Sequence, residues 1–309
     1  MSIVRNVLTF DVEDWPQSTL DPKLPMTGRV RDNTLRILDL LAAAEVRATF
    51  FVLGLVAQRF PDLVRRLQAE GHEIGCHGHA HGAVHAMRPE QFRTDLRDSL
   101  ARIQDSAGTR VTGYRAPDFS IPASALWALE ILAEEGLRYD SSIFPFAGPR
   151  YGIPGAFRVP FRVRCAANPE FVEFPLTTCE FLGRRLPAAG GGYFRLLPYA
   201  WSRLAIRRLN HDGHPATAYF HPYEIDPDEI RDLRHVIPWR LRLTQGLGRR
   251  LVPARLSRLL AEFSWGPAAP WLEAREALTA DRILDLRAPV PGAPVPVPCG
   301  DKALTRGDR

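Results

Sequence analysis

The sequence predicts an α/β protein whose parallel strands form a βα-repeated sheet or barrel. Short apolar runs alternate with amphipathic helical patterns over roughly the first 140 residues, the order that βα units produce. Polar, reactive residues cluster just after the apolar runs, at the predicted carboxyl ends of strands, where such folds gather their functional groups. A length of 309 residues and an apolar fraction of 45% suit one large domain with extensions, or two domains.

The predicted elements of the first half follow in regular order. Strands are expected at 6–12, 49–53, 72–76 and 111–119, with another beginning at 137–140. Between them, apolar residues three or four positions apart predict helices at about 30–44, 57–70, 92–103 and 122–135. Gly71 and Gly136 occupy the positions just beyond two of these helices, where glycine ends a helix readily.

The second half is less regular. Prolines and glycines indicate elaborated loops over about 144–197, followed by a helix at 198–209, a strand at 216–220 and a late helix at 252–263. We expect residues 1–265 to form the catalytic domain. Residues 266–309 are then a C-terminal extension, which is Pro-rich and extended or disordered after residue 286.

Three histidines at alternate positions, His77, His79 and His81, follow the predicted strand at 72–76. His77 and His81 are four residues apart and could converge on one divalent cation, because neutral imidazole is a common ligand for zinc and related metals. A three-ligand site needs a further group, usually a carboxylate, from elsewhere in the chain. The alternative is a solvated histidine-rich loop without an ion.

The first predicted strand ends in an acidic cluster of Asp11, Glu13 and Asp14. Three carboxylates within four residues repel one another unless a cation or a proton neutralises part of their charge. This cluster is therefore the expected source of the missing metal ligand. A simple acidic turn is the alternative.

Arg115 and His221 follow two further predicted strands. Either residue alone could simply pair with a nearby acid. Together with a metal and a spare carboxylate they complete a hydrolytic set. The metal polarises a carbonyl and activates water, the carboxylate accepts a proton, and a histidine on the opposite side protonates the leaving amine.

Charge and cysteine content restrict the remaining functions. The net charge of +5 is a mild excess, although late arginines cluster at Arg240, Arg242, Arg249, Arg250, Arg255 and Arg258. Such a patch could meet an anionic polymer or membrane surface, but no motif accompanies it that would predict a nucleic-acid partner. The unpaired spacing of Cys76, Cys165, Cys179 and Cys299 predicts reduced thiols. With no signal-like start and no apolar run of about 20 residues, the sequence predicts a cytoplasmic protein without a membrane span.

Five motifs, in the same order, resemble those of the NodB-type polysaccharide deacetylases, carbohydrate esterase family 4. They lie at 9–15, 77–81, 115–120, 139–145 and 219–224, and the resemblance covers roughly residues 5–265. The chain is most similar to the subgroup encoded with exosortase-linked exopolysaccharide loci. The resemblance implies a distorted (β/α) barrel of about seven strands, with loop insertions and a C-terminal helical extension.

The resemblance also implies the site. Asp11 would be the general base, Arg115 would tether that base and tune it by charge, and His221 would be the general acid. His77 and His81 would join one acid in binding a divalent metal, commonly zinc. His79 occupies a variable middle position and is expected beside the site without being a ligand.

This chain departs from the family at the acidic ligand, because Val12 replaces the second of two adjacent aspartates. In an extended strand, residues 11 and 13 share a face, which favours Glu13 as the ligand. If the chain turns after Val12, Asp14 could serve instead. We slightly favour Asp14, because its shorter arm suits a strand-to-loop turn.

The predicted activity is metal-dependent removal of acetyl groups from an N-acetylated amino-sugar polysaccharide or its precursor in exopolysaccharide biosynthesis. The expected partner is therefore an acetylated glycan. One alternative is a metal-dependent amidohydrolase acting on a small non-sugar amide, and another is a non-catalytic carbohydrate-binding protein. An extended aromatic groove around Trp15, Phe119, Phe144 and Tyr193 would favour a sugar, whereas a closed pocket would favour a small amide.

Overall fold

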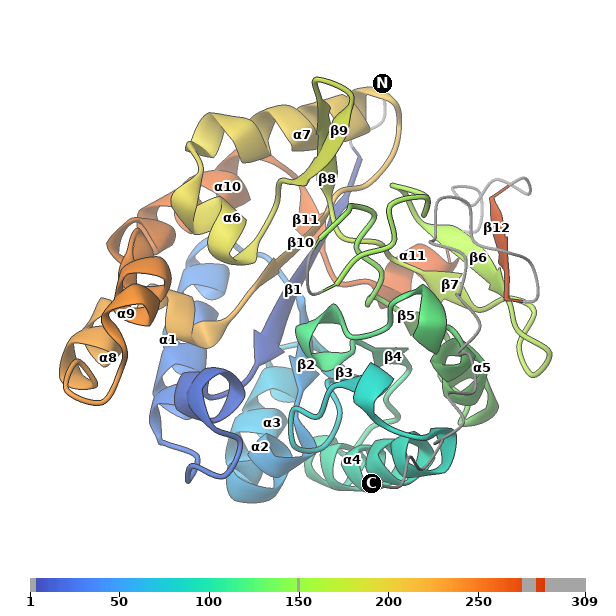
Figure 1. Ribbon diagram of the computed structural model, residues 1–309, viewed down its shortest axis with the longest axis horizontal. Helices are drawn as coiled ribbons and strands as arrows, with labels where there is room; N and C mark the ends of the chain where they lie inside the picture. The colour runs from blue at the N-terminus through green and yellow to red at the C-terminus, as the bar shows by residue number, and fades with distance from the viewer. Residues whose placement is uncertain (1–3, 149–150, 274–281, 287–309) are drawn as a thin grey trace, which may run out of the picture.

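The computed structural model describes residues 4–148, 151–273 and 282–286, and within them ten strands form one sheet (Figure 1). Every pairing in this sheet is parallel except that of β6 with β7. Across the sheet the order is β10 (Thr217–Phe220), β1 (Asn6–Val12), β2 (Thr49–Val52), β3 (Glu73–Cys76), β4 (Gly113–Tyr114), β5 (Tyr139–Asp140), β7 (Val172–Glu173), β6 (Phe161–Arg164) and β12 (Ile283–Asp285); β11 (Trp265–Gly266) also pairs with β1.

Helices lie around the outside of the strands (Figure 1). Their apolar faces pack on the sheet in one large core that includes Phe10, Phe50, Leu63 and Phe92. The α-helices are α1 (Arg29–Ala43), α2 (Gly54–Arg59), α3 (Pro61–Ala69), α4 (Pro89–Ala107), α5 (Trp127–Glu134), α6 (Gly191–Leu196), α7 (Tyr199–His211), α8 (Pro227–Asp232), α9 (Trp239–Gly246), α10 (Val252–Glu262) and α11 (Ala269–Glu273).

Strand β1 occupies a central position, and all seven of its residues are buried. It pairs with β2 along one edge and with β10 along the other. Since the side chains on both of its faces are buried, the whole strand lies inside the protein. This placement explains its almost continuous apolar sequence, because strands of parallel sheets are covered on both faces. The polar residues at its end are consequently carried into the interior.

Most predicted elements of the first half are confirmed, with three differences. Of the strand expected at 111–119, only Gly113–Tyr114 (β4) is extended in the sheet, and Pro117–Phe119 is a 3₁₀ turn. The helix expected at 57–70 is divided into α2 and α3 at Phe60. Pro61 begins α3, and because proline lacks a backbone N–H it cannot continue the helix that precedes it. The helix expected at 122–135 is shorter, since a 3₁₀ turn at Ala123–Ala125 precedes α5.

An irregular segment, residues 174–177, runs from β5 to β10. The backbone N–H of Phe174 donates to Asp140 O (2.8 Å), and that of Thr177 donates to Thr217 O (3.2 Å). This link brings strands that are distant in the sheet order to the same end of the protein. The hairpin of β8 (Thr178–Phe181) and β9 (Arg184–Pro187) follows it as a separate two-stranded sheet.

The described part of the expected C-terminal extension contributes to the main sheet. Gly266 of β11 pairs with Val7 of β1, and Ile283 of β12 pairs with Arg162 of β6. The predicted Pro-rich tail after residue 286, including Cys299, lies outside the described residues.

Two further sequence expectations concern thiols and membrane spans. The three described cysteines, Cys76, Cys165 and Cys179, are free and buried. Burial raises the pKa of the Cys76 and Cys165 thiols to about 12. Within the described ranges, no helix combines the length and apolar character that crossing a membrane requires.

Candidate active site

The carboxyl end of β1 places Asp11 and Glu13 on one side of the sheet. The strand stays extended through Val12, which pairs with Val52 of β2. Alternate residues of an extended strand face the same way, so Asp11 and Glu13 point into the same space. Both side chains are buried, at 2% and 3% exposure.

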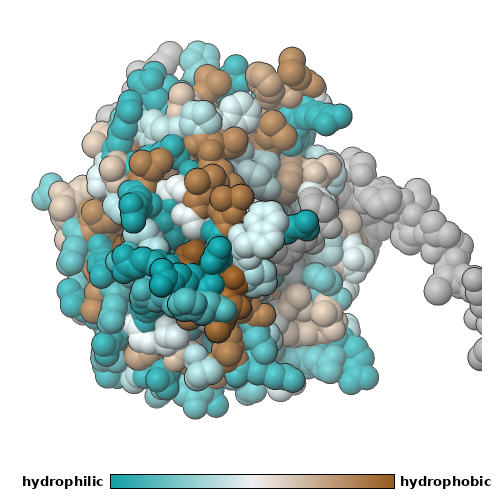
Figure 2. All heavy atoms as spheres, turned by 60° about the vertical axis from the view of Figure 1, so that its left-hand side comes forward, coloured by the Kyte–Doolittle hydropathy of each residue, from teal (hydrophilic) through white to brown (hydrophobic). Residues whose placement is uncertain are grey.

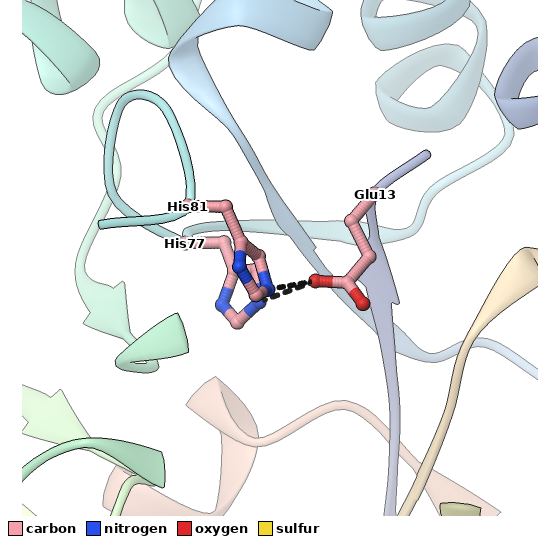
Figure 3. A group of neighbouring side chains, drawn as sticks. All are labelled: Glu13, His77 and His81. Atoms are coloured by element: carbon pink, nitrogen blue, oxygen red, sulfur yellow. Dashed lines mark ion pairs between the residues drawn. The ribbon is translucent and has the colours of Figure 1, made fainter. Parts of the chain in front are cut away.

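The turn after β3 directs His77 and His81 at Glu13 (Figure 3). The backbone N–H of His77 still donates to Val52 O (2.9 Å), which continues the pairing of β3 with β2. Gly78 then adopts a φ of +78°, and His81 a φ of +60°, so the chain turns back within four residues. Such a φ is uncommon for a residue other than glycine and is typical of functional turns.

Glu13, His77 and His81 form a compact group of possible metal ligands. One ligand atom from each lies within 4.8 Å of the other two. Nε2 of His77 lies 3.4 Å from Oε2 of Glu13, and Nε2 of His81 contacts the same oxygen. Among the described residues, this buried oxygen accepts no hydrogen bond. One carboxylate and two imidazoles are a donor set that fits zinc with an open position for water.

A backbone carbonyl orients His77. Its Nδ1 lies 2.8 Å from the carbonyl oxygen of Arg115, to which a protonated Nδ1 donates. Nε2 is then the unprotonated nitrogen that faces Glu13. Histidine ligands of metals are commonly fixed by a carbonyl in this way.

The carboxylates and histidines also interact electrostatically. Burial raises the pKa of Glu13, but the nearby charges of His81 and His221 and the contact with His77 lower it well below its usual range. Burial lowers the pKa of His81, but Glu13 and Asp118 raise it above its ordinary value. The cluster thus joins opposite charges inside the protein.

The structure does not place Asp14 with the histidines, although the sequence analysis favoured it as the ligand. The carboxylate of Asp14 instead accepts hydrogen bonds from Thr27, from Oγ1 at 2.6 Å and from the backbone N–H at 2.9 Å. The chain turns only after Glu13, so the extended-strand alternative describes the geometry. Burial raises the pKa of Asp14, while the Thr27 bonds oppose that rise.

Arg115 lies after β4 and is completely buried. Its guanidinium donates to Oδ1 of Asp11 (2.8 Å) and to Oγ1 of Thr9 (2.6 Å), both on β1. It also donates to the carbonyl oxygen (2.9 Å) and the hydroxyl (2.7 Å) of Ser141, and it lies over the ring of Phe51. Arg115 therefore joins β1 to the end of β5 and fixes the orientation of Asp11.

His221 follows β10 and lies beside Asp11. Its Nε2 is 3.8 Å from Oδ2 of Asp11 and 3.8 Å from Oε1 of Glu13. The sequence analysis expected His221 across the mouth from the base. The two residues are neighbours because β10 pairs with β1, with Phe220 opposite Phe10.

Glu224 holds the other side of His221. Its Oε2 lies 3.4 Å from Nδ1 of His221 and accepts a hydrogen bond from the His221 backbone N–H (3.1 Å). Burial lowers the pKa of His221, but Glu224, Glu13 and Asp11 raise it to about 9. The sequence analysis missed this role for Glu224. The spacing of three residues in a turn, as in a capping box, is the signal that could have revealed it.

A cavity of about 430 Å³ is lined by the ligand group, by the proposed base and acid, and by Glu224: Asp11, Glu13, His77, His81, His221 and Glu224. That volume lies within the range of about 300–1,000 Å³ common for small-molecule sites. Phe119 and Tyr193 line it as expected for an aromatic groove, whereas Phe144 is buried behind Phe119 in the same cluster and Trp15 is buried in another. Tyr219 and Tyr223 of the motif at 219–224 also line it, and further lining residues came from no sequence pattern: Tyr151, Arg195, Thr244 and Gln245.

His79 points away from the ligand group. Its backbone N–H donates to Asp95 on α4 (3.0 Å), and its ring lies against Gly54 of α2. It lines a shallow surface pocket with residues of α4, not the cavity that holds His77 and His81. His79 is therefore close to the ligand group in sequence but not in space.

Two family models match consecutive parts of the chain. Residues 5–139 match the polysaccharide deacetylase family, and residues 141–273 match a domain of unknown function, DUF3473. The boundary between them falls at the end of β5. The Asp11, Glu13, His77, His81 and Arg115 side chains lie in the first part, and His221 and Glu224 lie in the second.

Sequence relatives match only part of the chain. A peptidoglycan-N-acetylglucosamine deacetylase of Bacillus cereus is 35% identical over 124 residues, 40% of this chain and 40% of that protein. A peptidoglycan deacetylase of Helicobacter pylori is 33% identical over 110 residues, 35% of this chain and 36% of that protein. A chitooligosaccharide deacetylase of Bradyrhizobium is 26% identical over 134 residues, 43% of this chain and 59% of that protein. The chain thus spans between 36% and 59% of these relatives' length.

Solved structures share the fold over most of the chain. A Mycobacterium smegmatis protein assigned to the polysaccharide deacetylases has a TM-score of 0.59 and 22% identity, covering 91% of this chain and 93% of that chain. An allantoinase has a TM-score of 0.57 and 17% identity, covering 89% and 92%. At these identities the likeness describes the fold alone.

Proposed function

We propose that the protein, whose residues 5–139 match the polysaccharide deacetylase family, is a metal-dependent hydrolase that removes N-acetyl groups from an amino-sugar polysaccharide or its precursor. The single observation that carries this proposal is the convergence of the Glu13, His77 and His81 group with Asp11 and His221 in one cavity. An amide hydrolase needs the same combination of a metal, a base and an acid.

Glu13, His77 and His81 would hold one divalent ion, with zinc as the expected metal. Bound there, the ion would supply a Lewis acid that polarises the acetyl carbonyl and makes a coordinated water more acidic. The support is the chemistry and closeness of the donor set, together with the carbonyl that orients His77.

Asp11 would accept the proton of the attacking water. Arg115 donates to Oδ1 of Asp11, and this bond leaves Oδ2 on the side of the cavity that faces His221. Arg115 has no access to solvent, so its part would be to position Asp11 without contacting substrate.

His221 would donate a proton to the departing amine. Glu224 lies at Nδ1, so Nε2 is the nitrogen directed toward Asp11 and Glu13. We assign Glu224 the task of holding this ring orientation.

The substrate class rests on the relatives and on the cavity. Relatives that match part of the chain are named as deacetylases of peptidoglycan or chitooligosaccharide. Aromatic rings in the cavity wall, including Tyr193 and Tyr223, suit the faces of sugar rings. A role in exopolysaccharide biosynthesis remains a prediction from the sequence resemblance. A cytoplasmic location remains a prediction from features of the sequence such as the unpaired spacing of the cysteines.

The test is acetate release by the metal-loaded protein from N-acetylglucosamine oligomers, peptidoglycan fragments and small N-acetylated amides. We expect release from glycans. His221→Ala and Asp11→Asn should retain metal and lose about 10²–10⁴ in rate, the typical effect of removing a positioned acid or base. Turnover of the small amides alone would favour the amidohydrolase alternative, and unchanged acetate release by His221→Ala would remove its role as the acid.

Metal content tests the ligand assignment separately. Glu13→Gln and His77→Ala with His81→Ala should lose the ion, as measured by elemental analysis. Asp14→Asn is the matched control, because it removes a neighbouring carboxylate that hydrogen-bonds to Thr27 and lies outside the ligand group. Loss of metal in Asp14→Asn with retention in Glu13→Gln would reverse the assignment.

A further inference from the structure

An exposed apolar surface follows the segment from α8 to the start of α10. We call this surface the α9 face, and it comprises Val236, Trp239, Leu243, Leu247 and Leu251. These side chains are between 51% and 71% exposed. Trp239 and Leu243 lie one turn apart on α9, a helix with no buried residue. Large apolar side chains gathered on a surface commonly mark an interaction site.

The body of the protein holds α9 firmly. Leu241 packs against the cluster of Trp15, Ile230 and Ile237. Beyond the helix, buried Arg249 pairs with Glu229 (2.9 Å) and donates to Asp226 O (3.0 Å). The α9 face is therefore presented outward on a fixed support.

Arginines surround this apolar surface. A groove of about 470 Å³ has Ile230, Leu247 and Leu251 in its walls, and it is also lined by Arg231, Arg234, Arg242 and Arg250. The nearby acids Asp228 and Asp232 pair with Arg231, and Asp232 also pairs with Arg29. Arg234, Arg242 and Arg250 of this groove have no carboxylate partner within the part of the chain that the structure describes, and neither has Arg240 on α9.

Apolar and positively charged groups thus share one face of the molecule. Figure 2 shows the side of the protein on which α8 and α9 lie, with brown apolar side chains beside a broad group of teal hydrophilic ones. Trp239 additionally carries the guanidinium of Arg240 over its ring, at 5.4 Å.

We propose that the α9 face docks on the surface of an anionic phospholipid bilayer. The apolar side chains would enter the region between headgroups and acyl chains, and the arginines would pair with lipid phosphates. Tryptophan favours this interface, and guanidinium groups bind phosphate bidentately. An anionic glycan would engage the arginines but not the five exposed apolar residues.

The position of α9 links this surface to the candidate active site. Thr244 and Gln245 of α9 line the active-site cavity, as does half-exposed Leu196. Docking through the α9 face would hold the cavity near the bilayer surface. Membrane binding itself does not depend on the proposed deacetylase chemistry, so the two proposals fail separately.

Vesicle co-sedimentation of the full chain tests the proposal. Vesicles of phosphatidylcholine alone are compared with vesicles that also contain phosphatidylglycerol. We expect binding to the anionic vesicles and weaker binding at high salt. Trp239→Ser with Leu243→Ser should weaken binding at least about tenfold, because each removes apolar area from the interface. Arg242→Gln with Arg250→Gln should have an effect of at least similar size.

Matched controls come from other exposed sites. Leu182→Ser removes a leucine that is 86% exposed in the β8–β9 turn, and Arg65→Gln with Arg207→Gln removes two exposed arginines elsewhere. Both controls should bind like the native protein. Absence of binding to anionic vesicles would overturn the proposal, as would equal losses in the controls. The proposal would also be overturned if only the arginine substitutions weakened vesicle binding. It would likewise be overturned if the substitutions of Trp239 and Leu243 dissociated a dimer instead.

Discussion

At the residue scale, the hydrogen bonds of Asp14 indicate a structural role, whereas Glu13 lies in the group of possible metal ligands. Asp14 is 1% exposed and accepts two bonds from Thr27, which fastens the end of β1 to the chain just before α1. We predict that Asp14→Asn lowers the free energy of unfolding by about 1–3 kcal/mol, because its amide leaves one Thr27 donor unsatisfied. Urea denaturation measures this change.

Two comparisons complete that experiment. Thr27→Val removes the hydroxyl from the same pair and should destabilise the protein as well. Metal content should stay unchanged in Asp14→Asn. A stable Asp14→Asn protein without metal would contradict the structural role and make Asp14 a ligand.

The sequence could predict part of this site for a physical reason. The spacing of His77 and His81 after an apolar run predicts a turn at the end of a strand. This pattern could be recognised because all of its residues are close together in the sequence. The choice between Glu13 and Asp14 depends on Thr27, whose approach follows from the path of the intervening loop. The ring-holding contact of Glu224 likewise depends on the conformation of a turn.

At the scale of elements, β5 and β7 bury two carboxyl groups side by side. Asp140 is paired with Glu173 in the strand register, and neither is exposed. Burial raises the pKa of Asp140 to about 6. Burial and the neighbouring Asp140 raise the pKa of Glu173 well above its usual range. Glu173 accepts a hydrogen bond from Ile143 N–H (2.9 Å), so the pair also supports the chain after β5.

This pair should make stability depend on pH. A carboxyl group with a raised pKa in the folded state contributes its full stability below its unfolded pKa of about 4. The contribution is lost as the pH rises through about 6 and above. We predict that Glu173→Gln, which keeps an acceptor for Ile143 but cannot ionise, loses less stability than the native protein between pH 5 and pH 8. Denaturation midpoints measure the difference, and parallel pH profiles would contradict it.

The ring of Tyr139 on β5 lies directly over Gly113 of β4, which has no side chain. A Cβ placed there would lie 2.0 Å from Cζ of Tyr139. We predict that Gly113→Ala costs at least about 1–3 kcal/mol of stability, because the core must shift to admit a methyl group. Gly28→Ala is the control, since no described atom lies within 4 Å of its added Cβ. Equal denaturation midpoints for the two variants would show that the ring of Tyr139 can move.

At the scale of the whole molecule, a bound metal would connect β1 to the loop after β3. A ligand that binds only the folded state stabilises it, by about 2.7 kcal/mol at a concentration 100-fold above its Kd. We predict that chelation lowers the thermal unfolding midpoint of the native protein but leaves that of His77→Ala with His81→Ala unchanged. Equal shifts in both proteins would place the stabilising metal elsewhere.

The overall architecture was predictable only where neighbours in sequence are neighbours in the sheet. The βα order of residues 6–140 predicts β1 to β5, because each of these strands pairs with the next one along the chain. The pairing of β1 with β10 is the exception in this group. The pairings of β11 with β1 and of β12 with β6 join residues more than 100 positions apart. These strands have only two and three residues, too few to show a period.

The central position of β1 has a consequence for synthesis of the protein. This strand leaves the ribosome well before its partner β10, which ends at Phe220. At about 5–20 residues per second, the roughly 200 intervening residues take about 10–40 s to be added. During that interval the nascent chain carries an apolar strand with one unsatisfied hydrogen-bonding edge, the feature that promotes aggregation. Chaperone contact during translation would therefore protect the very strand that carries Asp11 and Glu13.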